Sequence, residues 1–214
     1  MEIIRAREEG GVPTISDSEK KRILTELSAG RLIVYPTETV YGIGCDPFDE
    51  TAVKRAYMAK RRPFDMPMSV VVSNLPMMEE LGVLDDRARK LVKKFMPGPL
   101  TLIVAKRPSV PDILTASTNE IGIRIPDHPL ALSLIDAFGP LVTTSANVHS
   151  HKDSIHCQDA VDDLGESISI YIDAGQSPLG RPSTIVEFIV GEIAIIRQGS
   201  ITEEQIEAAL NERG

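Results

Sequence analysis

The sequence contains no tryptophan, and aromatic residues make up only 4% of its 214 residues. Proteins that recognise single-stranded RNA commonly stack the bases on aromatic side chains placed among cations. No stretch of the sequence shows that interleaving. The shortage of aromatic residues therefore counts against a surface that binds RNA by stacking.

Long hydrophobic runs and cysteines are also scarce. No run approaches 18 consecutive apolar residues, so no membrane-spanning helix is expected. Residues 1–5 do not begin a basic segment followed by an apolar one, so no secretory signal is expected. The two cysteines, Cys45 and Cys157, are too few for a disulfide framework. Together these absences predict a cytoplasmic protein that does not enter a membrane.

The two commonest nucleotide-binding signatures are missing. The sequence has no Gly-x-x-x-x-Gly-Lys-Ser/Thr phosphate loop. Residues 42–44 read only Gly-Ile-Gly, and Pro47 stands where a dinucleotide fingerprint would place its third glycine. A nucleotide site is not excluded, but it would have to use other residues.

The net charge of −8 is unevenly distributed. Residues 51–111 contain twelve Lys or Arg against five Asp or Glu, whereas the remainder contains eleven against twenty-six. A basic stretch in an acidic chain indicates a surface that meets an anion. The cations of 87–94 recur at helical spacing, which favours an ordinary solvated helix face. Residues 60–62 lie at a predicted helix end, where they suit either a polyphosphate or compensation of the helix dipole.

Strands and helices alternate along the sequence. Helices are predicted at 18–29, 50–59, 87–95, 129–138 and from 203 onward, and strands at 2–6, 32–35, 69–72, 100–105, 121–125, 168–172, 184–188 and 192–197. Asp49 is a suitable cap for the second helix, and Thr202 opens a capping-box pattern before the last. This alternation predicts an α/β fold with a twisted sheet. The close spacing of the last three strands predicts antiparallel hairpins, and therefore a mixed sheet.

Four segments, 36–44, 60–63, 143–147 and 180–184, carry polar residues that a hydrophobic core does not need. Hydroxyls at the carboxyl end of a strand are typical of a ligand crevice in α/β proteins, although a capped turn explains the first segment equally well. Arg197 follows an apolar run and is a candidate for the same crevice. Arg124 lies among apolar strand residues and needs an anionic partner, either a protein carboxylate or that of a substrate.

Taken together and in order, these segments resemble the YrdC-like family, the L-threonylcarbamoyladenylate synthases. The matching stretches are PTETVYGIGCDPF at 36–48, KRRPFDMP at 60–67, MPGPLT at 96–101, IGIRIPDHPLA at 121–131, TTSAN at 143–147, DAGQSPLGRPST at 173–184 and IIRQGSI at 195–201. One such stretch is weak evidence, but seven in order are specific. The resemblance implies a twisted mixed sheet with flanking helices around a large concave cleft. It also implies a single catalytic domain over residues 1–214, the short form of the family.

The activity implied by the resemblance joins L-threonine, bicarbonate and ATP, releasing pyrophosphate and forming threonylcarbamoyl-AMP. A threonylcarbamoyl transferase complex would then modify an adenosine of tRNA. The residues implied to bind ATP are Lys60, Arg62, Phe64, Ser145, Asn147 and Arg197, and those implied to bind threonine are Thr37, Tyr41, Ser69, Arg124, Thr143 and Ser183. Mg²⁺ would accompany ATP, held by phosphates and water rather than by protein ligands. We expect Lys60 and Arg197 to face phosphates and therefore to contribute little to folding.

The sequence departs from the family pattern in three places. Met66 stands where Lys or Asn is usual, and Glu120 stands where Thr is common. In the loop after Asn147 the sequence reads Val-His-Ser-His, whereas most family members have one residue followed by Ser-Gly. This loop also gathers His149, His151, His156 and Cys157, whose spacing matches no standard zinc site. Cys45 is interpreted as a small buried residue rather than a nucleophile.

Two other functions are compatible with parts of the sequence. The first is a non-catalytic RNA-binding module that uses the basic stretch 51–111. The second is a related carbamoyl-adenylating activity, as in larger hydrogenase-maturation proteins, whose acylphosphatase and zinc-finger regions are absent here. Thr37, Arg124 and Ser183 favour the synthase over the RNA-binding module, because an amino-acid pocket needs them whereas a phosphate-binding surface does not.

Overall fold

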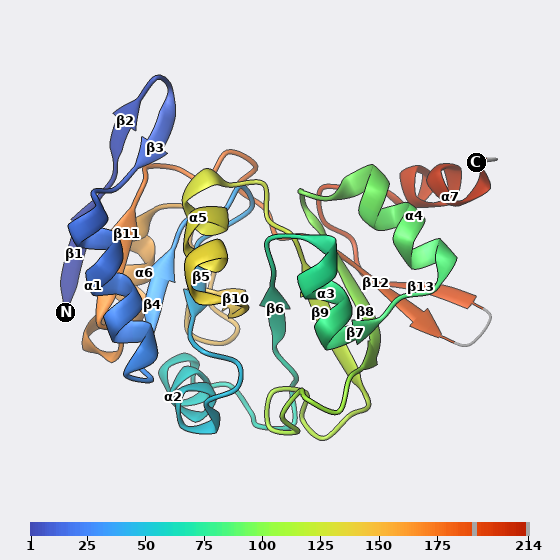
Figure 1. Ribbon diagram of the computed structural model, residues 1–214, viewed down its shortest axis with the longest axis horizontal. Helices are drawn as coiled ribbons and strands as arrows, with labels where there is room; N and C mark the ends of the chain where they lie inside the picture. Colours follow the sequence, from blue (N-terminus) through green and yellow to red (C-terminus); the bar gives the residue numbers. More distant parts are fainter. Residues whose placement is uncertain (190–191, 213–214) are drawn as a thin grey trace.

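The computed structural model describes residues 1–189 and 192–212, and one large sheet runs through them (Figure 1). Its strands follow the order β1 (Glu2–Arg5), β11 (Ile170–Asp173), β4 (Ile33–Tyr35), β5 (Gly42–Gly44), β10 (Leu141–Ser145), β6 (Ser69–Val71), β9 (Glu120–Arg124), β8 (Leu100–Lys106), β12 (Thr184–Ile189) and β13 (Glu192–Arg197), and β7 (Gly82–Val83) pairs with β8. The pairs β1–β11, β11–β4, β6–β9 and β8–β12 are parallel, whereas the other pairs are antiparallel. The predicted mixed sheet is therefore confirmed.

Helices flank both halves of this sheet. They are α1 (Asp17–Ser28), α2 (Glu50–Lys60), α3 (Leu75–Leu81), α4 (Asp86–Phe95), α5 (Pro129–Phe138), α6 (Cys157–Leu164) and α7 (Glu203–Asn211). Helices α1 and α5 lie over one half, whereas α3, α4 and α7 lie at the other (Figure 1). The buried apolar residues of α1 and α5 pack with β4 in one core cluster, and the remaining helices contribute to a second, larger one. Among the described residues, no helix combines the length and hydrophobicity that crossing a bilayer requires.

Local signals set the bounds of several helices. The Asp49 carboxylate accepts hydrogen bonds from Thr51 N (2.8 Å) and Ala52 N (3.2 Å), which satisfies two of the free amides at the start of α2. Arg61 ends the same helix in the left-handed region, with φ 50°. Pro129 stands at the start of α5, where its missing N–H has no cost. The Asp49 cap and the proline at the start of α5 lie where the sequence predicts them.

The short strand β10 joins the two halves of the sheet. Its first three residues pair with β6, with Thr143 opposite Ser69. Its last two pair with β5, with Ser145 opposite Gly42. The hydroxyl-rich residues 143–145 therefore lie where the two halves meet, between segments that are far apart in the sequence.

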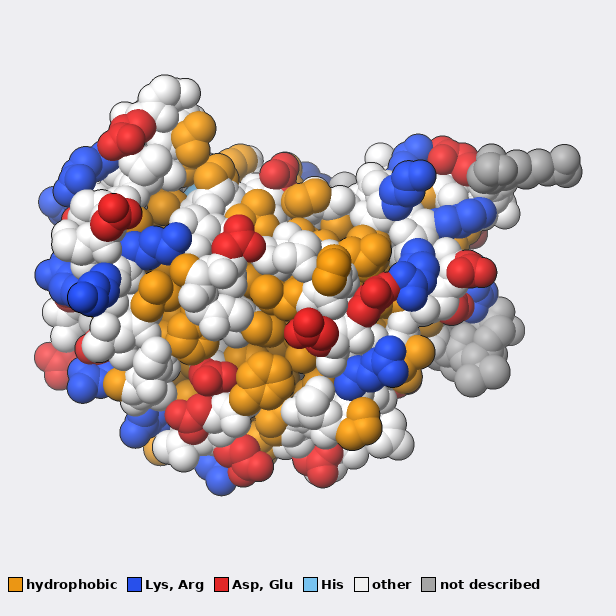
Figure 2. Space-filling view, in the orientation of Figure 1, with side chains coloured by type: hydrophobic (Ala, Val, Ile, Leu, Met, Phe, Trp, Pro, Cys, Tyr) orange, Lys and Arg blue, Asp and Glu red, His pale blue; other side chains and the backbone are white. Residues whose placement is uncertain are grey.

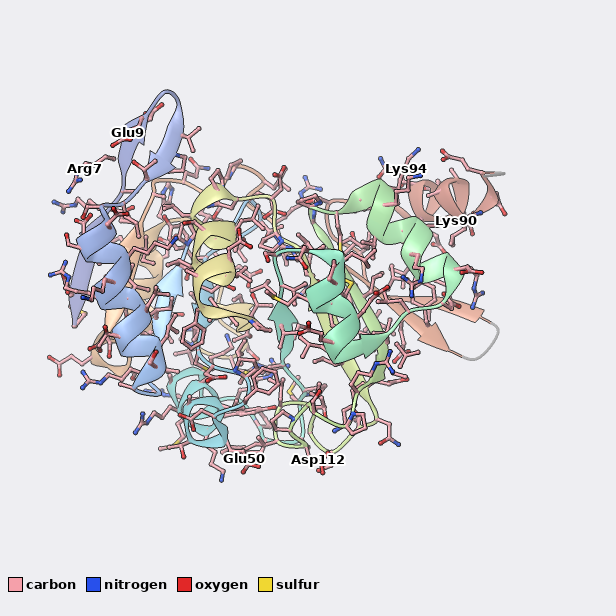
Figure 3. All side chains as sticks on the ribbon, viewed as in Figure 1. Arg7, Glu9, Glu50, Lys90, Lys94 and Asp112 are labelled. Atoms are coloured by element: carbon pink, nitrogen blue, oxygen red, sulfur yellow. The ribbon has the colours of Figure 1, made fainter. Side chains whose placement is uncertain are left out.

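The cations of α4 lie on the molecular surface, as their helical spacing predicts. Lys90 Nζ donates to the carbonyl oxygens of Leu210 (3.3 Å) and Glu212 (2.9 Å), and Lys94 pairs with the Glu212 carboxylate at 2.7 Å. Arg89 pairs with Glu79. Lys90 and Lys94 project beside α7 in Figure 3, and the blue side chains over α4 are visible in Figure 2. Three of these cations are therefore occupied with holding neighbouring elements.

Two fold predictions need correction. Strand β11 does not form a hairpin with β12, because it inserts between β1 and β4 at the opposite end of the sheet, and only β12 and β13 form the predicted antiparallel hairpin. A separate hairpin of β2 (Arg7–Glu9) and β3 (Val12–Thr14), labelled by Arg7 and Glu9 in Figure 3, and helices α3 and α6 were not predicted. These elements are short, so their sequences carry little periodicity.

The Gly-Ile-Gly run of 42–44 has a packing role. It forms β5, which pairs antiparallel with β4. A Cβ added at Gly44 would lie 2.9 Å from the Tyr35 ring, and one at Gly42 would lie 3.3 Å from it. The Tyr35 hydroxyl donates to Thr143 Oγ1 at 3.0 Å. The two glycines therefore leave room for an aromatic ring that reaches across the sheet to β10.

Candidate functional site

A cavity of about 180 Å³ opens where the two halves of the sheet meet. Its lining residues are Thr37, Thr39, Val40, Tyr41, Gly42, Arg62, Pro67, Met68, Ser69, Thr101, Arg124, Thr143, Thr144, Ser145, Pro182, Ser183, Ile185 and Arg197. Hydroxyl groups and three guanidinium groups dominate this set, and it contains no carboxylate. Such a lining suits a small polar ligand that carries negative charge.

Nine of the twelve predicted site residues line this one cavity: Thr37, Tyr41, Arg62, Ser69, Arg124, Thr143, Ser145, Ser183 and Arg197. The other three, Lys60, Phe64 and Asn147, do not line it. Lys60 and Asn147 are buried beside it, with 2% and 4% exposure. Phe64 is exposed, with its ring 4.9 Å from that of Tyr57.

Arg124 lies at the floor of the cavity because β9 alternates in the usual way. Ile121 and Ile123 face the hydrophobic core, and Arg124 faces the cavity. Its Nε donates to Gly98 O (3.1 Å) and its Nη1 to Thr39 Oγ1 (2.8 Å). The guanidinium is therefore held rigidly while part of its edge borders the cavity.

The anionic partner that Arg124 needs is the carboxylate of Glu38. Glu38 Oε2 lies 2.5 Å from Arg124 Nη2, and the two side chains are 9% and 7% exposed. Among the described residues, neither Glu38 oxygen has a partner in hydrogen-bond geometry. The contact is therefore a buried ion pair, and the protein supplies the first of the two partners that the sequence left open.

Arg197 lies at the rim of the cavity and is solvent-exposed. Its Nε and Nη2 donate to Ser183 O at 3.1 and 2.9 Å, and its Nη2 also contacts Ser183 Oγ at 3.2 Å. Ser183 Oγ in turn lies 2.8 Å from Thr101 Oγ1. Partial burial lowers the pKa of Arg197, and the positive charge of Arg124 acts in the same direction, whereas Asp153 raises it. Arg124 and Arg197 therefore both place positive charge beside the same cavity.

The turn that carries Arg197 depends on the absence of a side chain at Gly199. A Cβ there would lie 2.3 Å from Pro182 O and 2.5 Å from both Ser183 C and Thr184 N. Gly199 N and Ile201 N donate to the Thr184 hydroxyl, each at 3.0 Å. The turn is thus packed directly against the backbone that presents Ser183.

Gly199→Ala is therefore expected to displace Ser183 and Arg197. Overpacking of this kind costs about 1–3 kcal/mol of unfolding free energy, and we expect ATP binding to weaken as well. Urea denaturation and a binding titration measure the two effects. Ser200→Ala is the matched control, because the Ser200 hydroxyl has no hydrogen-bond partner in the described part of the chain. A Gly199→Ala protein indistinguishable from the control would contradict the packing described above.

Arg62 approaches the cavity from the loop after α2. Its Nε donates to Met66 O (3.1 Å) and its Nη2 to Pro67 O (2.9 Å). Burial lowers the pKa of Arg62. Because Met66 contacts Arg62 through its backbone carbonyl, the unusual side chain at this position leaves the contact intact. Glu120, the second departure, does not line the cavity. It lies beside Glu187, whose pKa is raised by burial and, to a smaller extent, by Glu120.

The histidine-bearing loop after Asn147 is held by hydrogen bonds. His151 Nδ1 lies 3.1 Å from Asp163 Oδ1, and Cys157 is buried at the start of α6. Within residues 1–189 and 192–212, no three His, Cys, Asp or Glu side chains are grouped so that they could hold a metal ion. Cys45 is fully buried, as predicted, and burial raises the pKa of its thiol.

Among the residues of the site that were not singled out from the sequence, three contact predicted site residues: Glu38, Thr39 and Thr101. Thr39 and Thr101 line the cavity, and Glu38 pairs with Arg124. All three lie within stretches that carry the family resemblance, 36–48 and 96–101, so a signal was present. Their roles depend on contacts with residues far away in the chain. Thr39 contacts Arg124, 85 residues further on, and Thr101 contacts Ser183, 82 residues further on.

Known proteins resemble this chain over most of its length. The family model described as "Telomere recombination", Sua5/YciO/YrdC, matches residues 25–199. A putative threonylcarbamoyl-AMP synthase of Methanocaldococcus jannaschii is 36% identical over 197 residues, covering 90% of this chain and 93% of that protein. One of Mycobacterium tuberculosis is 37% identical over 185 residues, covering 86% and 85%.

Solved structures agree with this assignment. The crystal structure of P. abyssi Sua5 complexed with L-threonine superimposes with a TM-score of 0.93 at 32% identity, covering 99% of this chain and 62% of that one. This chain therefore spans about three fifths of the length of that Sua5. From the family model, the relatives and the shared fold together, the chain belongs to the Sua5/YciO/YrdC family.

Proposed function

We propose that the chain is a threonylcarbamoyl-AMP synthase, which joins L-threonine, bicarbonate and ATP and releases pyrophosphate. The observation that carries this proposal is the position of Arg124 at the floor of a hydroxyl-lined cavity, with Arg62 and Arg197 on the same cavity. A guanidinium fork matches a carboxylate in geometry as well as in charge. Relatives over most of the chain are named as this enzyme, which supports the proposal.

Threonine would bind at the floor of the cavity. Its carboxylate would meet the edge of Arg124, and the hydroxyls of Thr37, Thr143 and Ser183 would surround its polar atoms. Typical sites for drug-sized ligands have volumes of about 300–1,000 Å³, whereas this cavity measures about 180 Å³. A cavity of this size suits an amino acid.

ATP would lie at the open side of the cavity. Arg197 at the rim and Arg62 in the adjacent loop would neutralise the phosphates and the charge that develops at the α-phosphorus. The carbamate oxygen of the substrate is the nucleophile, so the protein needs to position and neutralise rather than to supply a nucleophilic side chain. None of the described residues that line the cavity carries a carboxylate, so Mg²⁺ would be held by phosphate oxygens and water.

The threonylcarbamoyl-AMP formed here would pass to a transferase complex that modifies tRNA. We do not favour the alternative in which the basic stretch 51–111 serves as an RNA-binding module. Lys90, Lys94 and Arg89 are occupied by contacts with α7 and α3. Arg62, from the same stretch, lines the cavity.

A pyrophosphate-release assay tests the proposal. The purified protein with Mg²⁺ and ATP is expected to release pyrophosphate only when both L-threonine and bicarbonate are added. L-Valine, which has the shape of threonine without the hydroxyl, is expected to be more than about 100-fold less effective, because it leaves polar groups of the site unpaired. Release that does not depend on threonine would contradict the proposed function.

A further inference from the structure

The Lys60 ammonium has no donor left for a phosphate. Lys60 is the last residue of α2, and only 2% of its surface is exposed. Its Nζ donates to Ser145 O (2.5 Å), Asn147 O (2.8 Å) and Asn147 Oδ1 (3.2 Å). An ammonium has three donors, so these three acceptors account for all of them. The expectation that Lys60 contributes little to folding is therefore not supported by its surroundings.

Lys60 also holds the turn of residues 145–149 through its backbone. Its carbonyl oxygen accepts from His149 N at 2.7 Å. Within the turn, Ser145 Oγ donates to Asn147 Oδ1 (2.6 Å), and Asn147 Nδ2 donates to His151 O (2.7 Å). Residues 145–149 are thus attached to the end of α2 at both ends of the turn.

The electrostatic surroundings of Lys60 fit this role. Burial and, to a smaller extent, the charge of Arg62 lower the pKa of Lys60, Asp153 and Asp163 raise it, and together these effects place it at about 8. A buried cation is costly unless acceptors compensate for the lost water. The carbonyl and amide oxygens of the turn supply that compensation, so Lys60 and the turn stabilise each other.

We infer that Lys60 is a positioning residue. It holds the turn of residues 145–149 so that Ser145 faces the cavity, and it does not contact the phosphates. In this assignment the phosphate charge is met by Arg62 and Arg197, which line the cavity. The inference rests on the proposed function for the identity of the ligand only, because the contacts between Lys60 and the turn are internal to the protein.

Amide hydrogen exchange without added nucleotide tests the internal contacts. In Lys60→Met, exchange across 145–151 is expected to be about tenfold faster or more, because the turn loses all three ammonium contacts. Arg62→Met is the control, because it removes a cation that lies two residues further along the chain and lines the cavity. It is expected to leave this exchange unchanged. Unchanged exchange in Lys60→Met would overturn the inference whether or not the protein binds ATP.

The ionic-strength dependence of ATP affinity distinguishes positioning from phosphate contact. A cation that meets the phosphates makes binding sensitive to salt. Lys60→Met is expected to weaken ATP binding about tenfold with an unchanged salt dependence, whereas Arg62→Met flattens that dependence. Global destabilisation alone does not change the affinity of the folded protein, so a weaker affinity reports on the site.

Lys60→Gln keeps the test available where Lys60→Met does not fold. Glutamine keeps N–H donors for the turn but has no charge. We expect it to retain more ATP affinity than Lys60→Met and to keep the wild-type salt dependence. A flattened salt dependence in either variant, matching that of Arg62→Met, would show direct phosphate contact and overturn the inference. A wild-type protein that binds no ATP would overturn the proposed function instead, and the exchange experiment would still decide the role of Lys60.

Discussion

Arg124→Met is expected to raise the KM for threonine by about 30-fold to 4,000-fold. Truncating one partner of a buried, hydrogen-bonded charge pair costs about 2–5 kcal/mol, and each 1.4 kcal/mol is about tenfold in affinity. The affinity for threonine is expected to fall and that for ATP is not, because Arg124 lies at the cavity floor. There its Nε and Nη1 are held by Gly98 and Thr39. Steady-state pyrophosphate release, with each substrate varied in turn, measures the two KM values.

Arg124→Lys is the matched variant for this prediction. It keeps a positive charge opposite Glu38 and loses the planar fork. We expect its KM for threonine to lie between those of the wild type and Arg124→Met, with the KM for ATP within about twofold of the wild type. An Arg124→Met enzyme whose threonine KM is unchanged would show that the amino acid binds elsewhere. Equal increases in both KM values would point to a general distortion of the site.

Glu38→Ala is expected to lower the free energy of unfolding by about 3–5 kcal/mol, because it leaves the Arg124 charge buried without its partner. The two side chains are only 9% and 7% exposed, so water cannot replace the lost carboxylate. Urea denaturation monitored by circular dichroism measures the change. The exposed pair of Arg22 and Glu2, 55% and 42% exposed, provides the control. Glu2→Ala is expected to cost less than about 1 kcal/mol.

Two further measurements on the same pair separate a stranded charge from a simple loss of packing. The double variant Glu38→Ala/Arg124→Met is expected to be more stable than Glu38→Ala alone, since it removes the unpaired cation. Saturating threonine is expected to raise the melting temperature of Glu38→Ala more than that of the wild type, because the substrate carboxylate takes the place of the missing one. A Glu38→Ala protein as stable as the Glu2→Ala control would refute the buried ion pair.

Much of the secondary structure could be predicted because its signals are local. The helix at 129–138 was predicted with the bounds it has, from a proline at its start and a glycine after its end. Asp49 was predicted to cap α2 and does so. Capping and periodicity depend on residues within one or two turns. The short elements β2, β3, α3 and α6 were not predicted, because segments of eight residues or fewer seldom show a clear hydrophobic period.

Strand pairing could not be predicted in the same way. The position of β11 between β1 and β4, and the division of β10 between β5 and β6, depend on residues far apart in the chain. Spacing along the sequence carries no information about which distant strands bury each other. The alternation of strands and helices supplied the fold class, and the resemblance agreed with it, whereas the register that places Thr143 and Ser145 at the junction came from the structure.

The sequence by itself indicated most of the polar groups that line the site, because the ordered motifs resemble those of one family, but it did not single out Glu38, Thr39 or Thr101. Only the tertiary structure decided which of these groups face the cavity and which face the protein. Arg124 borders the cavity but is already paired with Glu38, and Lys60 is directed to a turn 85 residues further along the chain. The physical reason is burial: a charge removed from water needs partners from whatever segments surround it, and those segments are set by folding rather than by order in the sequence.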